Sequence, residues 1–288
     1  MQSLAHDVIN TSKAAAYSAM LMLFPAVLLV TTLVAQIQAG STLLGELRSI
    51  YERFLPTDTL DLLQSYALNP HLSSNRLILS AAFLSFFGAM GVMLSLMEGF
   101  RRAYHQPMDD WGFWSLRVRA LVLLPIALIP LSAATLVIVF GRQIELWIIN
   151  YASQSVRYVV LFFWRVTRLC VTFITISTVL AVLYHFGTRR KEHWLWVVPG
   201  AVGGTLIWFP TTLAYGWYVA RISNYSMFYG SFATGVATMV WLFITLFSVL
   251  MGAELNGALY RGRQTATVAA EPVAEPVSEQ TPDNSVRF

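Results

Sequence analysis

The feature of this chain that most restricts its fold is a set of long apolar stretches that contain no Asp, Glu, Lys or Arg. A hydrocarbon core about 30 Å thick is crossed by about 20 helical residues, because each residue of an α-helix rises about 1.5 Å. Such stretches predict an all-α, polytopic membrane protein. The six expected transmembrane spans are residues 14–38, 77–97, 120–140, 169–187, 195–220 and 231–253.

The composition agrees with a membrane protein. Hydrophobic residues make up 56% of the chain and charged residues 12%, whereas about a quarter of the residues in a soluble domain are charged. The formal charge of +4 fits loops that face anionic lipid headgroups, so membrane lipids are the expected partners and nucleic acid is not. The composition leaves protein partners and the oligomeric state open.

The distribution of Lys and Arg predicts the orientation, because loops on the cytoplasmic side are enriched in these residues. With the N-terminus in the cytoplasm, the two inner loops are strongly basic, whereas the outer arginines are spread over longer segments. We therefore expect both termini to be cytoplasmic. The basic residues of the inner loops are Arg101, Arg102, Arg117, Arg119, Arg189, Arg190 and Lys191.

The segments between the spans add short amphipathic helices. Residues 42–55 place apolar side chains at helical spacing, and Asp58 opens a second such stretch. We expect both on the outer surface, with a further one within residues 147–164. Residues 264–288 are acidic and proline-containing with little apolar surface, so we expect a disordered cytoplasmic tail after a membrane domain at residues 1–263.

Prolines occur within the first, third and fifth spans. A proline inside a span removes a backbone donor that lipid cannot replace, so it kinks or breaks the helix. Kinked spans can line a substrate path, as broken helices do in many transporters, or the kinks can simply improve packing. The prolines are Pro25, Pro125, Pro130, Pro199 and Pro210.

Small residues mark places where two helices can approach closely. Gly200 and Gly204 form a GxxxG pair in the fifth span, and Gly88 and Gly91 lie in the second. We expect another helix to pack against each pair.

Charged and polar residues gather where the second and sixth spans end on the expected cytoplasmic side. Glu98 and Glu254 close these spans, and Arg101 and Arg102 lie about one turn beyond Glu98. A carboxylate near hydrocarbon is costly unless it is paired. We therefore expect Glu254 to pair with these arginines or with those of the next inner loop, and Asn256 to support this network. The alternative is that the cluster binds a lipid headgroup or gates the inner mouth of a substrate path.

A polar and aromatic turn is expected at residues 224–230, between the last two spans on the outer side. Asn224, Tyr225 and Tyr229 belong to it, and Ser231 opens the sixth span. These residues either cap the backbone at the interface or face lipid or substrate.

The sequence lacks the patterns of a metal-dependent enzyme. A metal-dependent nuclease needs several His, Asp or Glu ligands at one or two ions, but the five histidines are scattered over both sides of the membrane. No phosphate-binding glycine loop of the Walker type is present. We therefore expect no metal site, no cofactor and no enzymatic activity.

Four segments of the chain resemble the YihY/BrkB family of bacterial inner-membrane proteins. They are AAAYSAMLMLFPAVLLV, MEGFRRAYH, WVVPGAVGGTLIWFPTTLAYGWYVARISNYSMFYGSFA and WLFITLFSVLMGAELNGALY. The resemblance covers about residues 10–260 and implies a six-span protein of the bacterial cytoplasmic membrane. The family has carried a virulence-factor description and a ribonuclease BN assignment now regarded as mistaken, and roles in envelope lipid transport have been suggested.

Together these observations predict a transporter or facilitator of an envelope lipid or another amphiphile, with the proline-kinked spans lining the route. The alternative is a non-catalytic membrane scaffold that recruits partners through its outer helices or its acidic tail. A transporter should contain a polar-lined cavity that reaches past mid-membrane, and a scaffold needs none.

Overall fold

Every secondary-structure element that the structure describes is a helix. The computed structural model describes residues 2–35, 75–106, 112–151, 154–188, 193–221 and 225–270. Six of its helices are long and apolar enough to cross a membrane, which confirms the predicted all-α polytopic class. The helices are α1 (Gln2–Ala35), α4 (Asn75–Ala103), α5 (Phe113–Tyr151), α6 (Gln154–Gly187), α7 (Trp194–Arg221) and α8 (Tyr225–Ala270).

The helices are longer than the predicted spans, and two local predictions are wrong for this reason. Residues 147–164 form no separate interfacial helix, because α5 continues to Tyr151 and α6 begins at Gln154. The turn predicted at residues 224–230 is helical from Tyr225 onwards, because the apolar run of the last span continues back through it. The helices predicted at residues 42–55 and after Asp58 lie outside the described residues.

The predicted tail also begins later than expected, because α8 remains helical to Ala270 instead of ending near residue 263. Residues 271–288 lie outside the described part of the chain. The last span is therefore part of a 46-residue helix, which is longer than any bilayer crossing requires.

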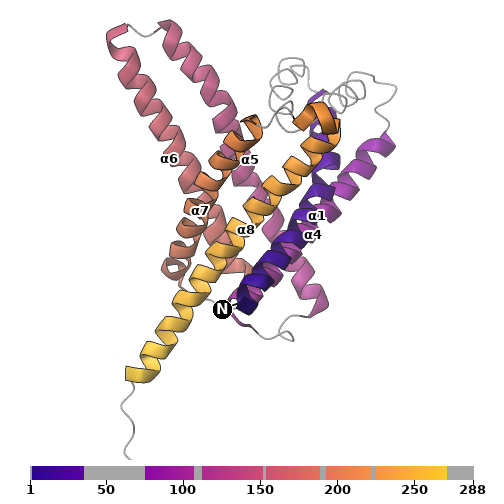
Figure 1. Cartoon of the computed structure of the whole chain (residues 1–288), viewed down its shortest axis with the longest axis vertical. Coiled ribbons are helices and arrows are strands. Elements are labelled where there is room, and N and C mark those ends of the chain that lie inside the picture. Colours follow the sequence, from indigo (N-terminus) through magenta and orange to yellow (C-terminus); the bar gives the residue numbers. More distant parts are fainter. Residues whose placement is uncertain are drawn as a thin grey trace, which may run out of the picture.

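The six helices form two groups that meet near one end and diverge toward the other (Figure 1). Helix α1 packs along α4 and α8, whereas α5 packs on α6 and on part of α4. Helix α7 joins the two groups, because it packs on both α6 and α8. The hairpin of α5 and α6 extends away from α1, α4 and α8 (Figure 1).

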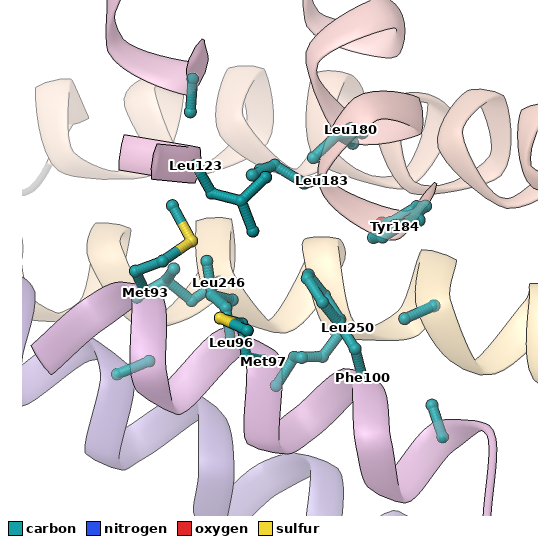
Figure 2. Packing of buried hydrophobic residues seen from close by; sticks show 14 of the residues in the cluster. Met93, Leu96, Met97, Phe100, Leu123, Leu180, Leu183, Tyr184, Leu246 and Leu250 are labelled. Atoms are coloured by element: carbon teal, nitrogen blue, oxygen red, sulfur yellow. The ribbon is translucent and has the colours of Figure 1, made fainter. Parts of the chain in front are cut away.

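Apolar side chains from four helices fill the place where the groups meet. Phe100 of α4 and Tyr184 of α6 pack edge to face, with ring centroids 5.2 Å apart. Figure 2 shows both rings beside Leu250 of α8, with Leu123 of α5 nearby. The Tyr184 hydroxyl donates a hydrogen bond to the Val249 carbonyl at 2.5 Å, so the one polar atom of this ring is satisfied. Apolar side chains therefore make up most of this part of the core.

Glycines allow α7 and α8 to come into backbone contact, as the GxxxG spacing predicted. A Cβ atom on Gly252 would lie 2.5 Å from both the Gly200 carbonyl oxygen and the Tyr184 hydroxyl. A Cβ atom on Gly204 would lie 3.2 Å from the Ser248 carbonyl oxygen. Lipid tails are as apolar as the side chains, so the hydrophobic effect does not drive helices together in a membrane. Close packing of this kind is therefore a main source of helix association there.

Gly88 and Gly91 have the same role between α4 and α1. A Cβ atom on Gly88 would lie 2.8 Å from Met22 Cβ, and one on Gly91 would lie 3.1 Å from the Ser18 hydroxyl oxygen. Both glycine pairs that were identified in the sequence thus face a neighbouring helix.

We predict that Gly252→Ala destabilises the protein, because the new methyl group meets a backbone oxygen that cannot move away without separating α7 from α8. Overpacking of this kind costs about 1–3 kcal/mol. Thermal unfolding in detergent should show a lower Tm. The matched control is Gly216→Ala in α7, where a Cβ atom meets nothing within 4 Å. An equal loss of stability in both variants would contradict the close α7–α8 contact.

Candidate functional site

An ion network lies at the C-terminal end of α4. Glu98, Arg101 and Arg102 have i, i+3 and i+4 spacing, which places them on one helix face. Arg101 donates to both carboxylate oxygens of Glu98, from Nε at 2.7 Å and from Nη2 at 2.6 Å. Arg102 Nε donates to the same carboxylate at 2.8 Å. Glu98 is therefore paired with both arginines.

Asp7 of α1 extends the network and was not predicted from the sequence. Its carboxylate lies 3.3 Å from Arg102 Nη1, so this contact joins α1 to α4. Because the two residues are 95 positions apart, no local spacing pattern could reveal the pair.

The end of α4 has the hydrogen bonds of a Schellman cap. The Gln106 amide donates to the Arg101 carbonyl and the His105 amide to the Arg102 carbonyl, both at 3.0 Å. His105 takes a left-handed backbone conformation with φ of 51°, which residues other than Gly rarely adopt. Arg101 Nη1 also donates to the Gln106 carbonyl at 2.9 Å, so it helps to hold this turn.

Helix α8 completes this end of the bundle. Arg261 Nη1 donates to the Ala103 carbonyl at 2.9 Å and lies 3.0 Å from His105 Nδ1. Gly257 lies directly against the Ala103 carbonyl, so no larger residue fits there. We name this cluster of Asp7, Glu98, Arg101, Arg102 and Arg261 the charged end. It joins α1, α4 and α8.

The predicted pairing of Glu254 is wrong. Within the described residues, the half-buried Glu254 forms no ion pair shorter than 4.0 Å. Arg101 and Arg102 are already engaged by Glu98, and Arg117 lies over the Phe113 ring with its guanidinium carbon 3.5 Å from the ring centroid.

Asn256 does not belong to the ion network, although the sequence predicted that it would. Its side chain is fully buried between α8 and α7. Asn256 Oδ1 accepts from the Gly200 amide at 2.7 Å, and its Nδ2 donates to the Val197 carbonyl at 2.9 Å. Pro199 lies between these two residues and lacks an amide proton. Asn256 therefore satisfies backbone groups of α7 beside a proline.

Gln106, just beyond the end of α4, has a buried side chain without hydrogen bonds to described residues. This holds for both its amide nitrogen and its amide oxygen. The cations of the charged end, by contrast, all hold carboxylates, carbonyls or His105. These bonds suit a structural role in which the arginines hold neighbouring helices together.

A second ion cluster lies in the hairpin of α5 and α6 and was missed by the sequence analysis. The carboxylate oxygen Oε1 of Glu145 lies 3.3 Å from Arg168 Nη1 and 3.8 Å from Arg165 Nε. Trp164 Nε1 donates to the Gly141 carbonyl at 3.1 Å, which fixes the two helices at the same level. The signal in the sequence was the isolated Glu145 among outer arginines.

The prolines do not gather around one space. Helices α1, α5 and α7 carry them, and each packs mainly on α4, α6 or α8 instead of on another proline-bearing helix. Pro125, Pro199 and Pro210 are exposed, whereas Pro25 and Pro130 are partly buried. A route lined by all three helices stays a prediction.

The residues of the predicted outer turn are only partly described. Tyr225, Tyr229 and Ser231 belong to the first turns of α8, but their side chains lie outside the described set, as does the whole of Asn224. Their proposed capping or substrate-facing role stays a prediction. No group of three or more His, Cys, Asp or Glu side chains in the described ranges could hold a metal ion.

Comparison with known proteins agrees with the resemblance seen in the sequence. The family model described as virulence factor BrkB matches residues 2–277, which include all six helices. The chain is also 24% identical over 260 residues to the ribonuclease-like protein YfkH of Bacillus subtilis (strain 168), covering 90% of this chain and 92% of that protein. No solved structure matches.

We predict that Asn256→Ala lowers the stability of the protein by about 1–3 kcal/mol, because two buried backbone groups of α7 lose their partner. The control is Ser248→Ala. Ser248 is equally buried, but its hydroxyl bonds only the Ile244 carbonyl of its own helix, so its removal strands no group on α7. Thermal unfolding in detergent should separate the two variants, and equal Tm values would contradict the bridging role of Asn256.

We also predict opposite behaviour of the two carboxylates. Glu98→Gln should destabilise the protein by about 1–3 kcal/mol, because it removes the negative partner of two arginines in a partly buried site. Glu254→Gln breaks no ion pair with a described residue and should keep the Tm of the wild type. The measurement is again thermal unfolding in detergent. A large loss of stability in Glu254→Gln would restore the original pairing hypothesis.

Proposed function

Because the chain belongs to the BrkB virulence factor family, we propose that it is a six-span protein of the bacterial cytoplasmic membrane that moves an envelope lipid or another amphiphile, or helps to distribute it. Both termini are cytoplasmic in this proposal, so the charged end faces the cytoplasm. The orientation rests on the basic inner loops of the sequence.

The observation that carries the proposal is the apolar character of the junction between the two helix groups. Met93, Leu123, Leu183 and Leu246 come together there from α4, α5, α6 and α8 (Figure 2). A polar solute would need hydrogen-bonding groups along its path, because an unpaired polar group in an apolar site costs several kcal/mol. An amphiphile can instead keep its chains in lipid beside the protein, so only its headgroup needs polar contacts.

The divergence of the helices supports the same reading. The α5–α6 hairpin separates from α1, α4 and α8 on the side away from the charged end (Figure 1). At the charged end, an ion pair joins α1 to α4 and a hydrogen bond from Arg261 joins α8 to α4. This asymmetry fits a protein that receives an amphiphile laterally from one leaflet. The polar-lined cavity expected of a transporter stays a prediction.

Glu254 is the best candidate for coupling movement to a gradient. A half-buried carboxylate near hydrocarbon without a close ion pair is costly, and such residues in membrane proteins commonly serve ion or proton pathways. The sequence contains no ATP-binding glycine loop of the Walker type, so energy must come from a gradient, a partner or the partitioning of the substrate.

We do not extend the ribonuclease-like name of the Bacillus subtilis relative to this chain. Metal-dependent hydrolysis of RNA needs converging acidic or histidine ligands, and the described residues offer no such group. The absence of enzymatic activity is part of the proposal.

We predict that liposomes containing the purified protein move a fluorescent phospholipid between leaflets faster than empty liposomes under an imposed pH gradient. Glu254→Gln should slow this movement several-fold at unchanged Tm, because the variant keeps the shape of the side chain and loses its charge. A truncation after Ala270 should transport normally, whereas a scaffold acting through its tail would depend on the missing residues. If no lipid in a panel of phospholipids and lipid A precursors moves, the transport proposal fails.

A further inference from the structure

An arginine of α8 is held at the end of α4 by a contact that depends on the protonation state of one histidine. Arg261 Nη1 lies 3.0 Å from His105 Nδ1 and 2.9 Å from the Ala103 carbonyl oxygen. A guanidinium group has hydrogen-bond donors and no acceptor. His105 Nδ1 is therefore the acceptor in this contact, which requires a neutral imidazole with its proton on Nε2.

The backbone at His105 holds the imidazole in this place. The residue has a φ of 51°, and its amide donates to the Arg102 carbonyl at 3.0 Å. Glycine is the usual residue at this position of a Schellman cap, because it takes the left-handed conformation without strain. A histidine accepts that strain and gains a side chain that reaches α8. Since residues held in rarely populated backbone regions often take part in a mechanism, the strain points to a role for the imidazole itself.

A proton on Nδ1 removes the acceptor. Histidine ordinarily changes its charge between pH 5 and 8, and His105 is exposed, so the proton can come directly from water. The imidazolium has a donor at each nitrogen and no acceptor. Nδ1 then faces Arg261 as a second cation, and its N–H can donate to the Ala103 carbonyl oxygen, 3.4 Å away. The charged histidine thus competes with Arg261 for the carbonyl that Arg261 holds.

Other bonds at this end of the bundle do not involve His105. Arg102 stays paired with Asp7, which joins α1 to α4. Asn256 keeps its two bonds to the backbone of α7. Loss of the Arg261 contacts therefore acts between α8 and α4, and it leaves the links from α1 to α4 and from α7 to α8 in place.

We propose that His105 and Arg261 form a pH-sensitive clamp between α4 and α8. The clamp is closed while His105 is neutral, and protonation of Nδ1 releases the C-terminal part of α8 from α4. The step is the binding of one proton from water, so it needs no further reactant. The inference rests on the proposed function only for the side of the membrane: in the proposed orientation the clamp responds to the pH of the cytoplasm.

Glu254 offers Arg261 a new partner once the clamp opens. It is the only carboxylate of α8 and lies seven residues before Arg261, so the two residues share one face of the helix. Glu254 forms no ion pair within the described residues. Attraction between the two side chains therefore favours the open state of the clamp.

Other ionisable groups at the same end can respond to pH as well. Glu98 and Asp7 already hold Arg101 and Arg102, and Asp109 and Asp110 lie outside the described residues. A variant of His105 alone is needed to assign a pH effect to it. The further cations and histidines on the helices of this end are Lys13, Arg117, Arg119, Arg263, His6, His185 and His193.

The test measures the distance from α1 to the end of α8 by pulsed EPR, on the full-length protein in detergent. Spin labels are attached at Asn10→Cys and Thr265→Cys, both exposed positions, in a Cys170→Ser background. Because Asp7 holds α1 to α4, the label on α1 reports the position of α4. Between about pH 7.5 and about pH 5.5, where histidine ordinarily gains its proton, the population at longer distance should rise several-fold. An unchanged distance distribution would overturn the clamp.

His105→Asn keeps the contact and removes the titration. Asparagine tolerates the left-handed conformation, and its Oδ1 is bonded to Cγ as Nδ1 is in histidine, so it can accept from Arg261 at every pH. This variant should keep the short distance at both pH values. A pH response as large as that of the wild type would assign the proton to another group and overturn the proposal.

Arg261→Gln removes the other half of the clamp and should show the longer distance at both pH values. The matched control is Arg263→Gln, because Arg263 lies over the Trp196 ring of α7 instead, with its guanidinium carbon 3.2 Å from the ring centroid. The control should keep the pH response of the wild type. Loss of the response in both variants, or in neither, would overturn the clamp. Should Arg261→Gln not fold, the comparison of the wild type with His105→Asn still decides.

The clamp and the transport function can fail separately. If the distance changes with pH in the wild type and not in His105→Asn, but no lipid moves in liposomes, the clamp stands and the transport function falls. If lipid moves and the distance stays the same at both pH values, the clamp falls and transport stands.

Discussion

Polar groups in the hydrocarbon region must find their partners inside the protein, because lipid offers none. The helix contacts of this bundle follow from that constraint. Asn256 satisfies two backbone groups of α7, and Trp208 Nε1 donates to the Thr245 hydroxyl at 3.1 Å along the same pair of helices. Near the other end of the pair, the Tyr215 hydroxyl donates to the Ala237 carbonyl at 2.7 Å. Since close glycine contacts lie between these bonds, α7 and α8 are joined over much of their length and should move as one unit.

Three helices without prolines each place a large buried side chain at the junction. Phe100 of α4, Tyr184 of α6 and Leu250 of α8 meet at the junction, and none of these helices contains a proline. A helix without prolines keeps its backbone hydrogen bonds complete, so it can pack tightly without exposing a carbonyl to lipid. The proline-bearing α1, α5 and α7 also contribute buried side chains to this core, among them Ala16, Leu123 and Val197.

The sequence was sufficient to predict the features that depend on local pattern. Hydropathy and length identified all six spans, and helical spacing alone brought Glu98 beside Arg101 and Arg102. It was insufficient where a partner lies on another helix, as for Asn256 with Gly200 and for Asp7 with Arg102. The same applies to Glu254, because two of its expected partners, Arg101 and Arg102, pair with Glu98. The ends of helices were also missed, because the arginines and polar residues near 142–157 and the glycine and asparagine of 224–230 are typical of loops.

The two ion clusters differ in which helices they hold together. At the charged end, Arg102 pairs with Asp7 of α1 and Glu98 of α4, and Arg261 of α8 donates to the Ala103 carbonyl of α4. In the α5–α6 hairpin, the single carboxylate of Glu145 lies near both Arg165 and Arg168. The first cluster therefore fixes three helices at one end of the bundle, whereas the second joins only α5 to α6.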